Sequence, residues 1–438
     1  MNPASLTGHI LELQRSIERS AYPPDHIVTD FFRSRKYLGS HDRRAIANAV
    51  FGLIRHRRFT ETLLEQFSKN HPGTEILSDP AVRALPIFVC YSELVDAGVK
   101  VPSAFWKIHF PNIDLSQYIT WIKENSSLTF LSHDNIQRLG VQYSFPDWMV
   151  RAWNDHIGDE TEDLLRGLNT QAPTALRVNV LLTDRAECQR RLAEEGIETE
   201  FTKISPVGLI AGKRFNSDAS AAYNDGWFEI QDEGSQLISL LVQPRPGSVV
   251  IDACAGAGGK SLHMAELMKN EGEIIALDID PKRLNKLRKR AERAHITIIR
   301  SYSENEIQRD NLIGKADFVL IDAPCSGSGT IRRNPGLKWS LTPSLVKHYS
   351  ERQLSILGRT VPFLKPEGTM LYATCSVFSD ENEAVVRAFL EKNPEYRVYS
   401  IEDRLAPYNL TPHGSLLTLY PHRHQTDGFF AAIIKRQS

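Results

Sequence analysis

The sequence predicts a multidomain chain with an all-α domain over 1–143, a small α/β domain over 144–226 and a C-terminal α/β domain over 227–438. In the first domain apolar residues repeat at helical spacing and strand-like alternation is scarce. The second domain mixes helix and strand signals. From residue 227 on, buried-type strands alternate with helices, which is the pattern of a mostly parallel, doubly wound sheet.

The composition is that of a globular protein. Hydrophobic residues make up 41% of the chain and charged residues 24%, which excludes long disorder or a fibrous repeat. Apolar runs are too short to span a bilayer, and the first twenty residues lack the features of a secretory signal, so we expect a cytoplasmic protein with no membrane partner. The five cysteines are too scattered for a disulfide framework. The sequence contains no C-x-x-C pair of the kind that binds structural zinc. We expect no metal site, and a monomer.

The N-terminal domain combines helices with basic charge. Helices are expected over 4–19, 25–36 and 59–68, and a further helix contains Ile46–Ile54, with Ser40 as its N-cap. Because the net charge is only −1, any nucleic-acid contact must come from local clusters. One such cluster consists of Arg33, Arg35, Lys36, Arg43, Arg44, Arg55, Arg57 and Arg58. A solvated helix face and a phosphate-contacting surface explain it equally well.

The other two domains supply the strands. In the small domain, strands are expected over 176–181 and 207–210 around a helix over 186–195. In the C-terminal domain, strands are expected over 248–251, 273–277, 297–300, 318–321, 370–373 and 429–435, with helices over 260–269, 281–294 and 343–361. The carboxyl ends of such strands are where ligands bind.

A glycine-rich turn follows the first strand of the C-terminal domain. It consists of Asp252, Ala253, Cys254, Ala255, Gly256, Ala257, Gly258, Gly259 and Lys260 and opens a helix. Asp278 ends the next strand, 19 residues past Gly259, a spacing that suits a carboxylate binding ribose hydroxyls. The charge of Asp252 would oppose a pyrophosphate but could face a cationic amino-acid group. We therefore favour S-adenosylmethionine (SAM) over NAD, and either over a turn that binds nothing.

Two later strands end in cysteines. Asp322, Ala323, Pro324 and Cys325 follow one of them, and Thr374 and Cys375 follow the other. A lone cysteine is most often inert and buried, but two at the ligand edge of a sheet favour chemistry. A thiolate that adds to carbon 6 of a pyrimidine activates carbon 5 toward a methyl donor and can leave afterwards. Lys260 is a candidate positive neighbour that favours the thiolate.

With these residues the chain resembles the Sun/Fmu-type (NOL/NOP/Sun) family of RNA cytosine-5 methyltransferases, and most closely its RsmB-like bacterial 16S rRNA members. The matching stretches are 176–179, 231–232, 252–260, 278–280, 322–325, 331–335, 338–339, 372–376 and 427–430. The resemblance implies a Rossmann-like SAM-dependent methyltransferase domain, an RNA-binding intermediate domain and a NusB-like helical domain. The N-terminal match rests only on helix content and basic character.

The resemblance also implies roles for individual residues. Cys375 would be the nucleophile, and Cys325 would assist elimination and product release. Asp322 and Lys260 would hold the cytosine ring and stabilise its developing charge. SAM would be bound by the Cys254–Lys260 loop and Asp278, with Asp252 and Asp322 in the same site. Arg332, Arg333 and Lys338 would reach RNA phosphates, whereas Trp339 could equally stack on a base or be buried, and the basic stretch 282–293 is expected to face solvent.

This sequence departs from the family pattern at two places. The first loop of the family usually reads Cys-Ala-Ala-Pro-Gly-Gly-Lys, and here Gly256 and Ala257 replace the alanine and proline. The third strand of the family usually ends in Gly-Asp, whose acid faces the adenine amine. Ser303 takes that place here, with Glu304 beside it, so adenine binding would be weaker or differently built.

Other functions remain open at this stage. Ribosomal RNA is the expected substrate, and tRNA or another RNA is the alternative. A DNA cytosine-5 methyltransferase would use Cys325 as its nucleophile, but Thr374-Cys375 speaks against it. A non-catalytic RNA-binding or ribosome-assembly protein would have been favoured by loss of a cysteine or of Lys260, and all three are present. A dehydrogenase is the most distant alternative.

Overall fold

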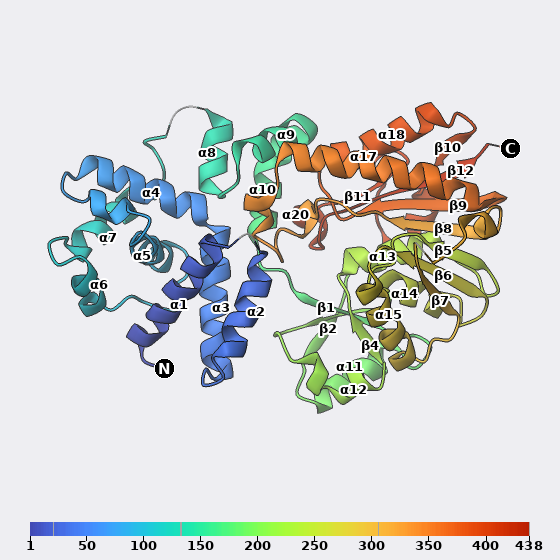
Figure 1. Ribbon diagram of the computed structural model, residues 1–438, viewed down its shortest axis with the longest axis horizontal. Coiled ribbons are helices and arrows are strands. Elements are labelled where there is room, and N and C mark those ends of the chain that lie inside the picture. The colour runs from blue at the N-terminus through green and yellow to red at the C-terminus, as the bar shows by residue number, and fades with distance from the viewer. Residues whose placement is uncertain (21, 132–133, 305, 438) are drawn as a thin grey trace. The chain divides into compact units, whose positions relative to one another are not determined.

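The computed structural model of the chain describes residues 1–20, 22–131, 134–304 and 306–437 (Figure 1). They form two compact units, neither of which is continuous in sequence. Unit 1 consists of 1–169 and 334–340, and unit 2 of 170–333 and 341–438. In the described part of the chain, no helix is long and apolar enough to cross a membrane.

Unit 1 is helical, as the apolar spacing predicts. Its helices are α1 (Pro3–Glu18), α2 (Pro24–Ser34), α3 (Ser40–Arg55), α4 (Arg57–Asn70), α5 (Ala84–Leu94), α6 (Ser103–His109), α7 (Leu115–Glu124), α8 (Asn135–Gln142), α9 (Asp147–Ile157), α10 (Thr161–Asn169) and α16 (Leu337–Ser340). Buried side chains such as Ile46, Phe67, Phe88 and Trp106 build one core. The expected N-cap is wrong by one residue, because α3 already begins at Ser40 and Gly39 caps it without a side-chain hydrogen bond.

Unit 1 extends beyond the expected domain limit at residue 143. The hydroxyl of Ser144 accepts a hydrogen bond of 2.9 Å from the backbone N–H of Phe59. The Arg58 guanidinium donates to the carbonyl of Phe145 and to Asp147, both at 2.6 Å. These bonds place α9 and α10 in the same compact unit as the preceding helices, whereas the expected domain limits stay a prediction.

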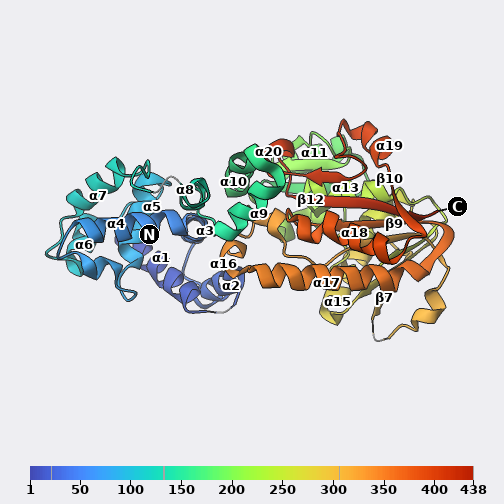
Figure 2. The same ribbon diagram turned by 90° about the horizontal axis from the view of Figure 1, so that it is seen from above.

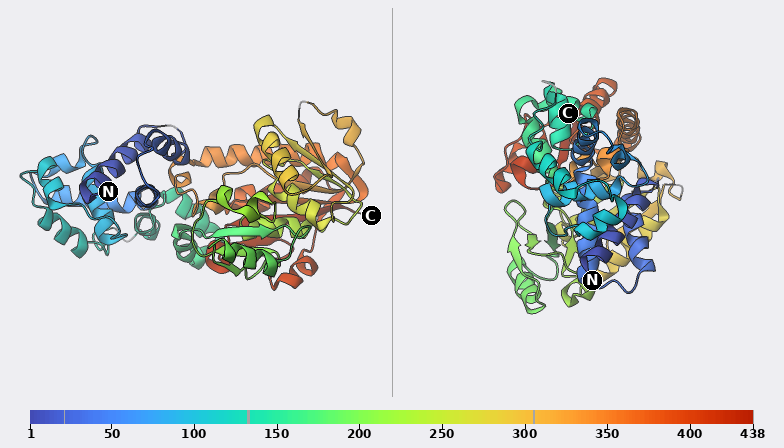
Figure 3. Two further views of the ribbon diagram at one scale, coloured as in Figure 1. Left: turned by 90° about the horizontal axis from the view of Figure 1, so that it is seen from below. Right: turned by 90° about the vertical axis from the view of Figure 1, so that its left-hand side faces the viewer.

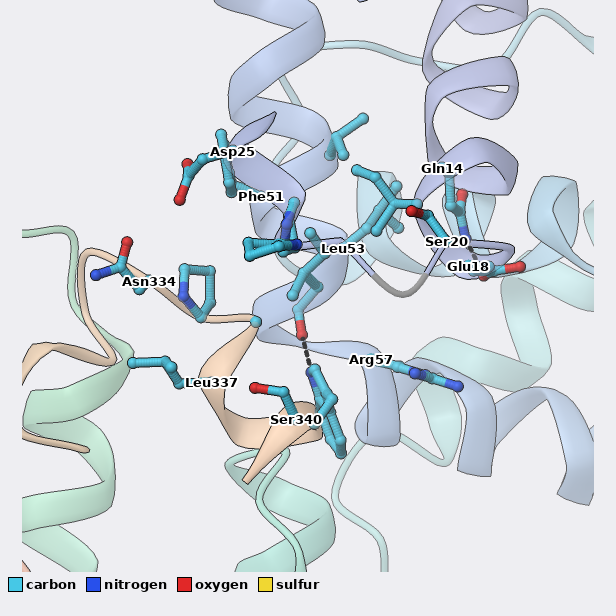
Figure 4. Close-up of a pocket in the computed structure, with 18 of the residues that line it drawn as sticks. Gln14, Glu18, Ser20, Asp25, Phe51, Leu53, Arg57, Asn334, Leu337 and Ser340 are labelled. Atoms are coloured by element: carbon cyan, nitrogen blue, oxygen red, sulfur yellow. Dashed lines mark hydrogen bonds between the residues drawn. The ribbon is translucent and has the colours of Figure 1, made fainter. Parts of the chain in front are cut away.

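A short segment from the second half of the sequence completes unit 1. Lys338 is fully buried, and its ammonium donates to the carbonyls of Arg55 (3.0 Å) and Tyr143 (3.2 Å) and to Asn169 (2.5 Å). The Trp339 indole donates to the carbonyl of Ile54 at 2.8 Å, the bond drawn in Figure 4. Lys338 therefore cannot meet an RNA phosphate here, and the expectation that it does so is corrected to a structural role.

Unit 2 contains a small antiparallel sheet of order β2-β3-β1-β4. Its strands are β1 (Thr174–Val178), β2 (Thr199–Phe201), β3 (Gly208–Ala211) and β4 (Phe228–Ile230), with helices α11 (Arg185–Glu194) and α12 (Ala221–Asn224). Two of these strands, β2 and β4, were not expected from the sequence. The core of this sheet is built from Leu176, Cys188, Leu209 and Phe228.

The main sheet of unit 2 runs β10-β12-β9-β8-β5-β6-β7, with β11 paired to β12. Its strands are β5 (Val249–Asp252), β6 (Glu273–Asp278), β7 (Ile299–Ser303), β8 (Ala316–Asp322), β9 (Leu364–Thr374), β10 (Tyr396–Tyr399), β11 (Leu417–Leu419) and β12 (Phe429–Arg436). The strands β5 to β9 pair in parallel and β12 is antiparallel to β9. The expected doubly wound fold is confirmed, although β10 and β11 were not expected.

Helices cover both faces of the main sheet (Figures 2 and 3). They are α13 (Glu233–Val242), α14 (Gly259–Leu267), α15 (Pro281–Arg293), α17 (Pro343–Thr360), α18 (Glu383–Lys392), α19 (Glu402–Leu405) and α20 (Pro421–His424). Side chains of β9 alternate between the faces: Leu371 and Ala373 join the core with α13 and α14, and Met370 and Tyr372 join the core with α17 and α18. Both faces are thus buried, as a parallel sheet requires.

Candidate active site

Four parallel strands deliver the candidate residues to one edge of the main sheet. Asp252 ends β5, Asp278 ends β6, Asp322 ends β8 and Thr374 ends β9. The chain leaves β5 toward β6 and returns with β8 on its other side, which makes the β5–β8 boundary a topological switch point. A cleft of 680 Å³ opens there, lined by these three carboxylates, the glycine-rich loop, Lys260, Cys325 and Cys375. The cleft is therefore the candidate active site.

The glycine-rich loop has a backbone that only glycine adopts easily. Gly256 and Gly258 have φ values of +55° and +85°, and a Cβ on Gly258 would lie 2.5 Å from Leu287. Asp278 fixes the loop, because its carboxylate accepts the N–H of Gly256 at 2.8 Å and that of Asp280 at 2.7 Å. Asp278, which is expected to bind the ribose hydroxyls, is thus buried beside the glycine-rich turn.

The contacts of Asp252 test whether the residues of the cleft fit SAM. One of its oxygens accepts the hydroxyl of Ser261 at 2.6 Å, and the other is buried with no hydrogen-bond partner among the described residues. Burial raises the pKa of this carboxyl to about 7. The second carboxylate oxygen of Asp252, which lacks a hydrogen-bond partner beside the cleft, fits the cationic amino group of SAM, and Asp278 fits its ribose.

The two candidate thiols meet at the sheet edge. The Sγ atoms of Cys325 and Cys375 lie 3.3 Å apart, because their loops follow the neighbouring strands β8 and β9. The hydrogen bond with Cys375, followed by burial, raises the pKa of the Cys325 thiol well above its ordinary value. Cys325 therefore keeps its proton and can share it with the sulfur of Cys375.

Lys260 supplies the positive charge beside the thiols. Its ammonium lies 2.7 Å from Asp322. Burial lowers the pKa of Lys260, but the charges of Asp322 and of a Cys375 thiolate act in the opposite direction and the net shift is upward. Lys260 is thus a cation in the lining of the cleft that also contains both thiols.

Sequence reasoning missed the buried Glu381, which joins the two cysteine loops. One of its oxygens accepts the hydroxyls of Ser326 (2.5 Å) and Ser376 (2.6 Å), and the other accepts the N–H of Ser326 at 2.8 Å. Gln353 adds a further hydrogen bond of 3.1 Å. The repeated Cys-Ser dipeptide was the available signal, since two adjacent serines at one sheet edge call for a common acceptor. Glu381 holds the thiols at their distance.

At the end of β7, the cleft is lined by Glu304 and not by Ser303. Ser303 is buried, its N–H donates to Glu306 at 3.0 Å, and its side chain does not line the cleft. Glu304 does line the cleft, and it is held by Arg309 (3.0 Å) and Arg359 (3.4 Å). Ser303 is therefore not placed to meet a ligand in the cleft, and an adenine contact by Glu304 stays a prediction.

The two arginines after the Cys325 loop also have internal partners. Arg332 is 4% exposed and donates to the carbonyls of Gln425 and Thr426 at 3.0 and 3.1 Å. Arg333 pairs with Asp232 at 2.7 Å and with Asp427 at 2.5 Å. Their expected phosphate contacts are corrected to a structural role, since carboxylates and carbonyls already occupy both guanidinium groups.

Most of the basic cluster in unit 1 is likewise paired internally. Arg33 pairs with Asp30, Arg35 with Glu12, Arg57 with Glu61, and Arg58 with Asp147. Arg43 and Arg55 donate to backbone carbonyls. These bonds favour the solvated helix face over the phosphate-contacting surface as the explanation of the cluster. Among the residues that the structure describes, no group of three or more His, Cys, Asp or Glu side chains is arranged to hold a metal ion.

Comparison with known proteins covers nearly the whole chain. Residues 239–435 match the family described as 16S rRNA methyltransferase RsmB/F, and 145–216 match its RsmF/B-like, ferredoxin-like domain. A probable ribosomal RNA small subunit methyltransferase B from Synechocystis sp. is 31% identical over 417 residues, covering 91% of this chain and 92% of that protein. A protein of the same description from Bacillus subtilis is 35% identical over 316 residues, or 69% of each chain.

Two solved structures share the fold. The crystal structure of PH0851 has a TM-score of 0.78 and 27% identity, and the match covers 100% of this chain and 99% of that one. The structure of NSun6 from Pyrococcus horikoshii with SFG has a TM-score of 0.58 and 20% identity, and covers 67% of this chain and 98% of that one. At 20% identity the second match shows the fold alone.

Proposed function

Because the chain belongs to the RsmB/F family of 16S rRNA methyltransferases, we propose that it methylates carbon 5 of a cytosine in ribosomal RNA through a covalent cysteine–cytosine adduct. SAM-dependent RNA methylation is the activity of this family. The observation that carries the finer proposal is the 3.3 Å contact between Cys325 and Cys375 beside the Lys260–Asp322 pair. Two thiols in contact at the cofactor edge provide one group for addition and one for elimination.

The reaction begins with the Cys375 thiolate, which adds to carbon 6 of the cytosine. Lys260 and Asp322 hold the ring and stabilise the charge that develops on it. When bound, SAM supplies an electrophilic methyl group, which the activated carbon 5 takes up. Cys325 then accepts the carbon 5 proton, and the carbon 6–sulfur bond breaks to return the Cys375 thiolate.

The two thiols are suited to these different roles. The hydrogen bond with Cys375 is the largest cause of the raised pKa of Cys325. Once the sulfur of Cys375 is bonded to carbon, it no longer attracts that proton. The pKa of Cys325 then falls, so that its thiol can release its proton to solvent and the resulting thiolate can act as the base once the adduct exists. This order of events favours Cys375 as the nucleophile.

Bisulfite sequencing of total RNA from a strain lacking the gene tests the proposal. We expect one 5-methylcytosine of the small-subunit rRNA to disappear, and to return with the wild-type gene. Loss of a methylcytosine in tRNA would instead favour the alternative RNA substrate. An unchanged methylcytosine profile would favour a non-catalytic RNA-binding protein of ribosome assembly.

Asp278→Ala is expected to weaken SAM binding by about 1.5–3 kcal/mol, the range for a hydrogen-bond partner that carries a charge. The substitution removes the ribose acceptor and frees the N–H of Gly256. Calorimetry on the purified variant measures the change. The matched control is Asp317→Ala, which loses an ion pair with Lys365 near the start of β8, outside the cleft. Equal SAM affinity in the two folded variants would remove Asp278 from the binding site.

The affinity for SAM should fall as the pH falls below about 7. The pKa of Asp252 is raised to about 7 in the free protein, and a cationic amino group binds only its ionised form. Protonation of Asp252 therefore competes with binding, and Kd should rise about tenfold between pH 7.5 and pH 6. Calorimetry across this range checks the slope, and Asp252→Asn should abolish it. A wild-type Kd that is constant with pH would contradict the contact.

A further inference from the structure

Arg290 connects the cofactor loop with the small sheet. Its Nη1 donates to the carbonyl of Ala257 at 2.7 Å. Its Nε and Nη2 donate to one oxygen of Glu229 at 3.2 and 3.0 Å. Glu229 lies on β4 and is 3% exposed, so its carboxylate is fixed among its partners. The Arg290 guanidinium thus joins the buried carboxylate of Glu229 to the backbone of the glycine-rich turn.

The loop needs such a support. Gly256 has a φ of +55° and no atom within 4 Å of the place where a Cβ would stand, so no packing holds this residue from that side. On either side, Asp278 holds the N–H of Gly256 and the carbonyl of Ala255 accepts the N–H of Gly258 at 2.8 Å. The carbonyl of Ala257 belongs to the same peptide group as this N–H of Gly258, and Arg290 holds that carbonyl at 2.7 Å. A glycine-rich turn that is not fixed would lose entropy when a ligand orders it.

A neighbouring arginine, Arg293, shares the acid with Arg290 but not the contact with the glycine-rich loop. Arg293 pairs with the other oxygen of Glu229 and stacks on the ring of Tyr223, with its guanidinium carbon 3.7 Å from the ring centroid. Both arginines therefore share one acid and one helix. Of the two, Arg290 lines the cleft and Arg293 does not.

We propose that Arg290, held by Glu229, is a positioning residue that keeps the Cys254–Lys260 loop in the conformation that binds SAM. The small sheet thereby sets the affinity of the main sheet for its cofactor. This inference rests on the assignment of the loop to SAM. Arg290 lies outside this loop and is anchored to Glu229 of the small sheet, and from there it preorganises the loop for the cofactor.

The test compares Arg290→Met with Arg293→Met. Each variant removes one ion pair with Glu229, but only Arg290→Met removes the bond to the Ala257 carbonyl. We expect Arg290→Met to raise the Kd for SAM about tenfold or more, the effect of losing a hydrogen bond to a charged group. Arg293→Met should change it by less than about threefold. Equal Kd values in the two variants would overturn the proposal.

Two further variants keep the test decisive if Arg290→Met folds poorly. Arg290→Lys retains the charge and should restore part of the affinity, whereas Glu229→Gln weakens the anchor and should raise Kd with Arg290 in place. An Arg290→Lys variant that binds SAM no better than Arg290→Met would contradict this role.

A direct contact between Arg290 and the SAM carboxylate is the competing explanation. Calorimetry with 5′-methylthioadenosine, which lacks the amino-acid part, separates the two. A loop that has lost its support should bind both compounds more weakly, since the loop is tied to Asp278 through Gly256. Weaker binding of SAM alone would show a direct contact and overturn the positioning role. All of these titrations omit RNA, so their outcome does not depend on which base is methylated.

Discussion

Cys375→Ala is expected to reduce cytosine methylation by roughly 10⁴-fold or more, because no other group replaces the attacking thiolate. The variant should form no covalent complex with RNA. It should still bind SAM, since the loop, Asp252 and Asp278 are unchanged. Methyl incorporation into RNA and denaturing gels measure the two effects, and calorimetry with SAM shows that the cleft remains intact.

Cys325→Ala should behave differently from Cys375→Ala. Addition to carbon 6 needs only the Cys375 thiolate, so the adduct should form. Release needs a base for the carbon 5 proton, and its loss should slow elimination by about 10²–10⁴-fold. A protein–RNA complex that resists denaturing gel conditions should therefore accumulate.

The control for both variants is Cys188→Ala, which removes a buried thiol from the core of the small sheet, outside the cleft. Burial raises the pKa of Cys188, so this thiol is not reactive and turnover should persist. A covalent complex with Cys375→Ala but not with Cys325→Ala would reverse the two roles. Full activity of both variants would exclude cysteine chemistry.

Lys338→Met should destabilise unit 1 by about 3 kcal/mol, because it leaves three buried acceptors without their donor. Burial, followed by the charge of Arg55, lowers the pKa of Lys338 well below its ordinary value. The ammonium also lies 3.7 Å from the centroid of the Phe145 ring, a contact that methionine replaces only in part. Hydrogen exchange of peptides from α3 and α9 should accelerate, whereas peptides from β5 and β8 should keep their protection.

The matched control is Lys347→Met, at an exposed lysine on α17. It should leave exchange unchanged throughout the described part of the chain. SAM affinity should be the same in both variants, because every residue that lines the cleft belongs to unit 2. Unchanged exchange in α3 of Lys338→Met would show that the three hydrogen bonds contribute nothing to stability.

The meeting of Cys325 and Cys375 at one sheet edge could be predicted because the signals for it are local. A strand followed by Asp322 and Cys325, and another followed by Thr374 and Cys375, need only lie side by side to bring two thiols together. β8 and β9 are such neighbours. The loop at Gly256 and Gly258 could be predicted for a similar reason, since both glycines have the positive φ that the pattern indicates.

The basic residues could not be assigned from the sequence because their partners are distant in it. Arg333 pairs with Asp232 and Asp427, which lie 101 and 94 positions away. Lys338 donates to the carbonyl of Arg55 across 283 positions. A charge beside a catalytic motif has the same local pattern whether it meets phosphate or a buried carbonyl. Only the fold separates the two outcomes.

The segment at 334–340 also has a consequence for the order in which the protein is made. The ribosome releases α1 to α10 first, yet the donors that satisfy the carbonyls of Arg55 and Ile54 arrive with Lys338 and Trp339. Between these events β1 to β8 must be synthesised. The first unit to emerge thus waits for most of the second before its last contacts close, although a nascent domain usually folds as soon as it is complete. During translation unit 1 should therefore gain its last contacts only after β8 has been made, and before β9 and β12 complete the main sheet of unit 2.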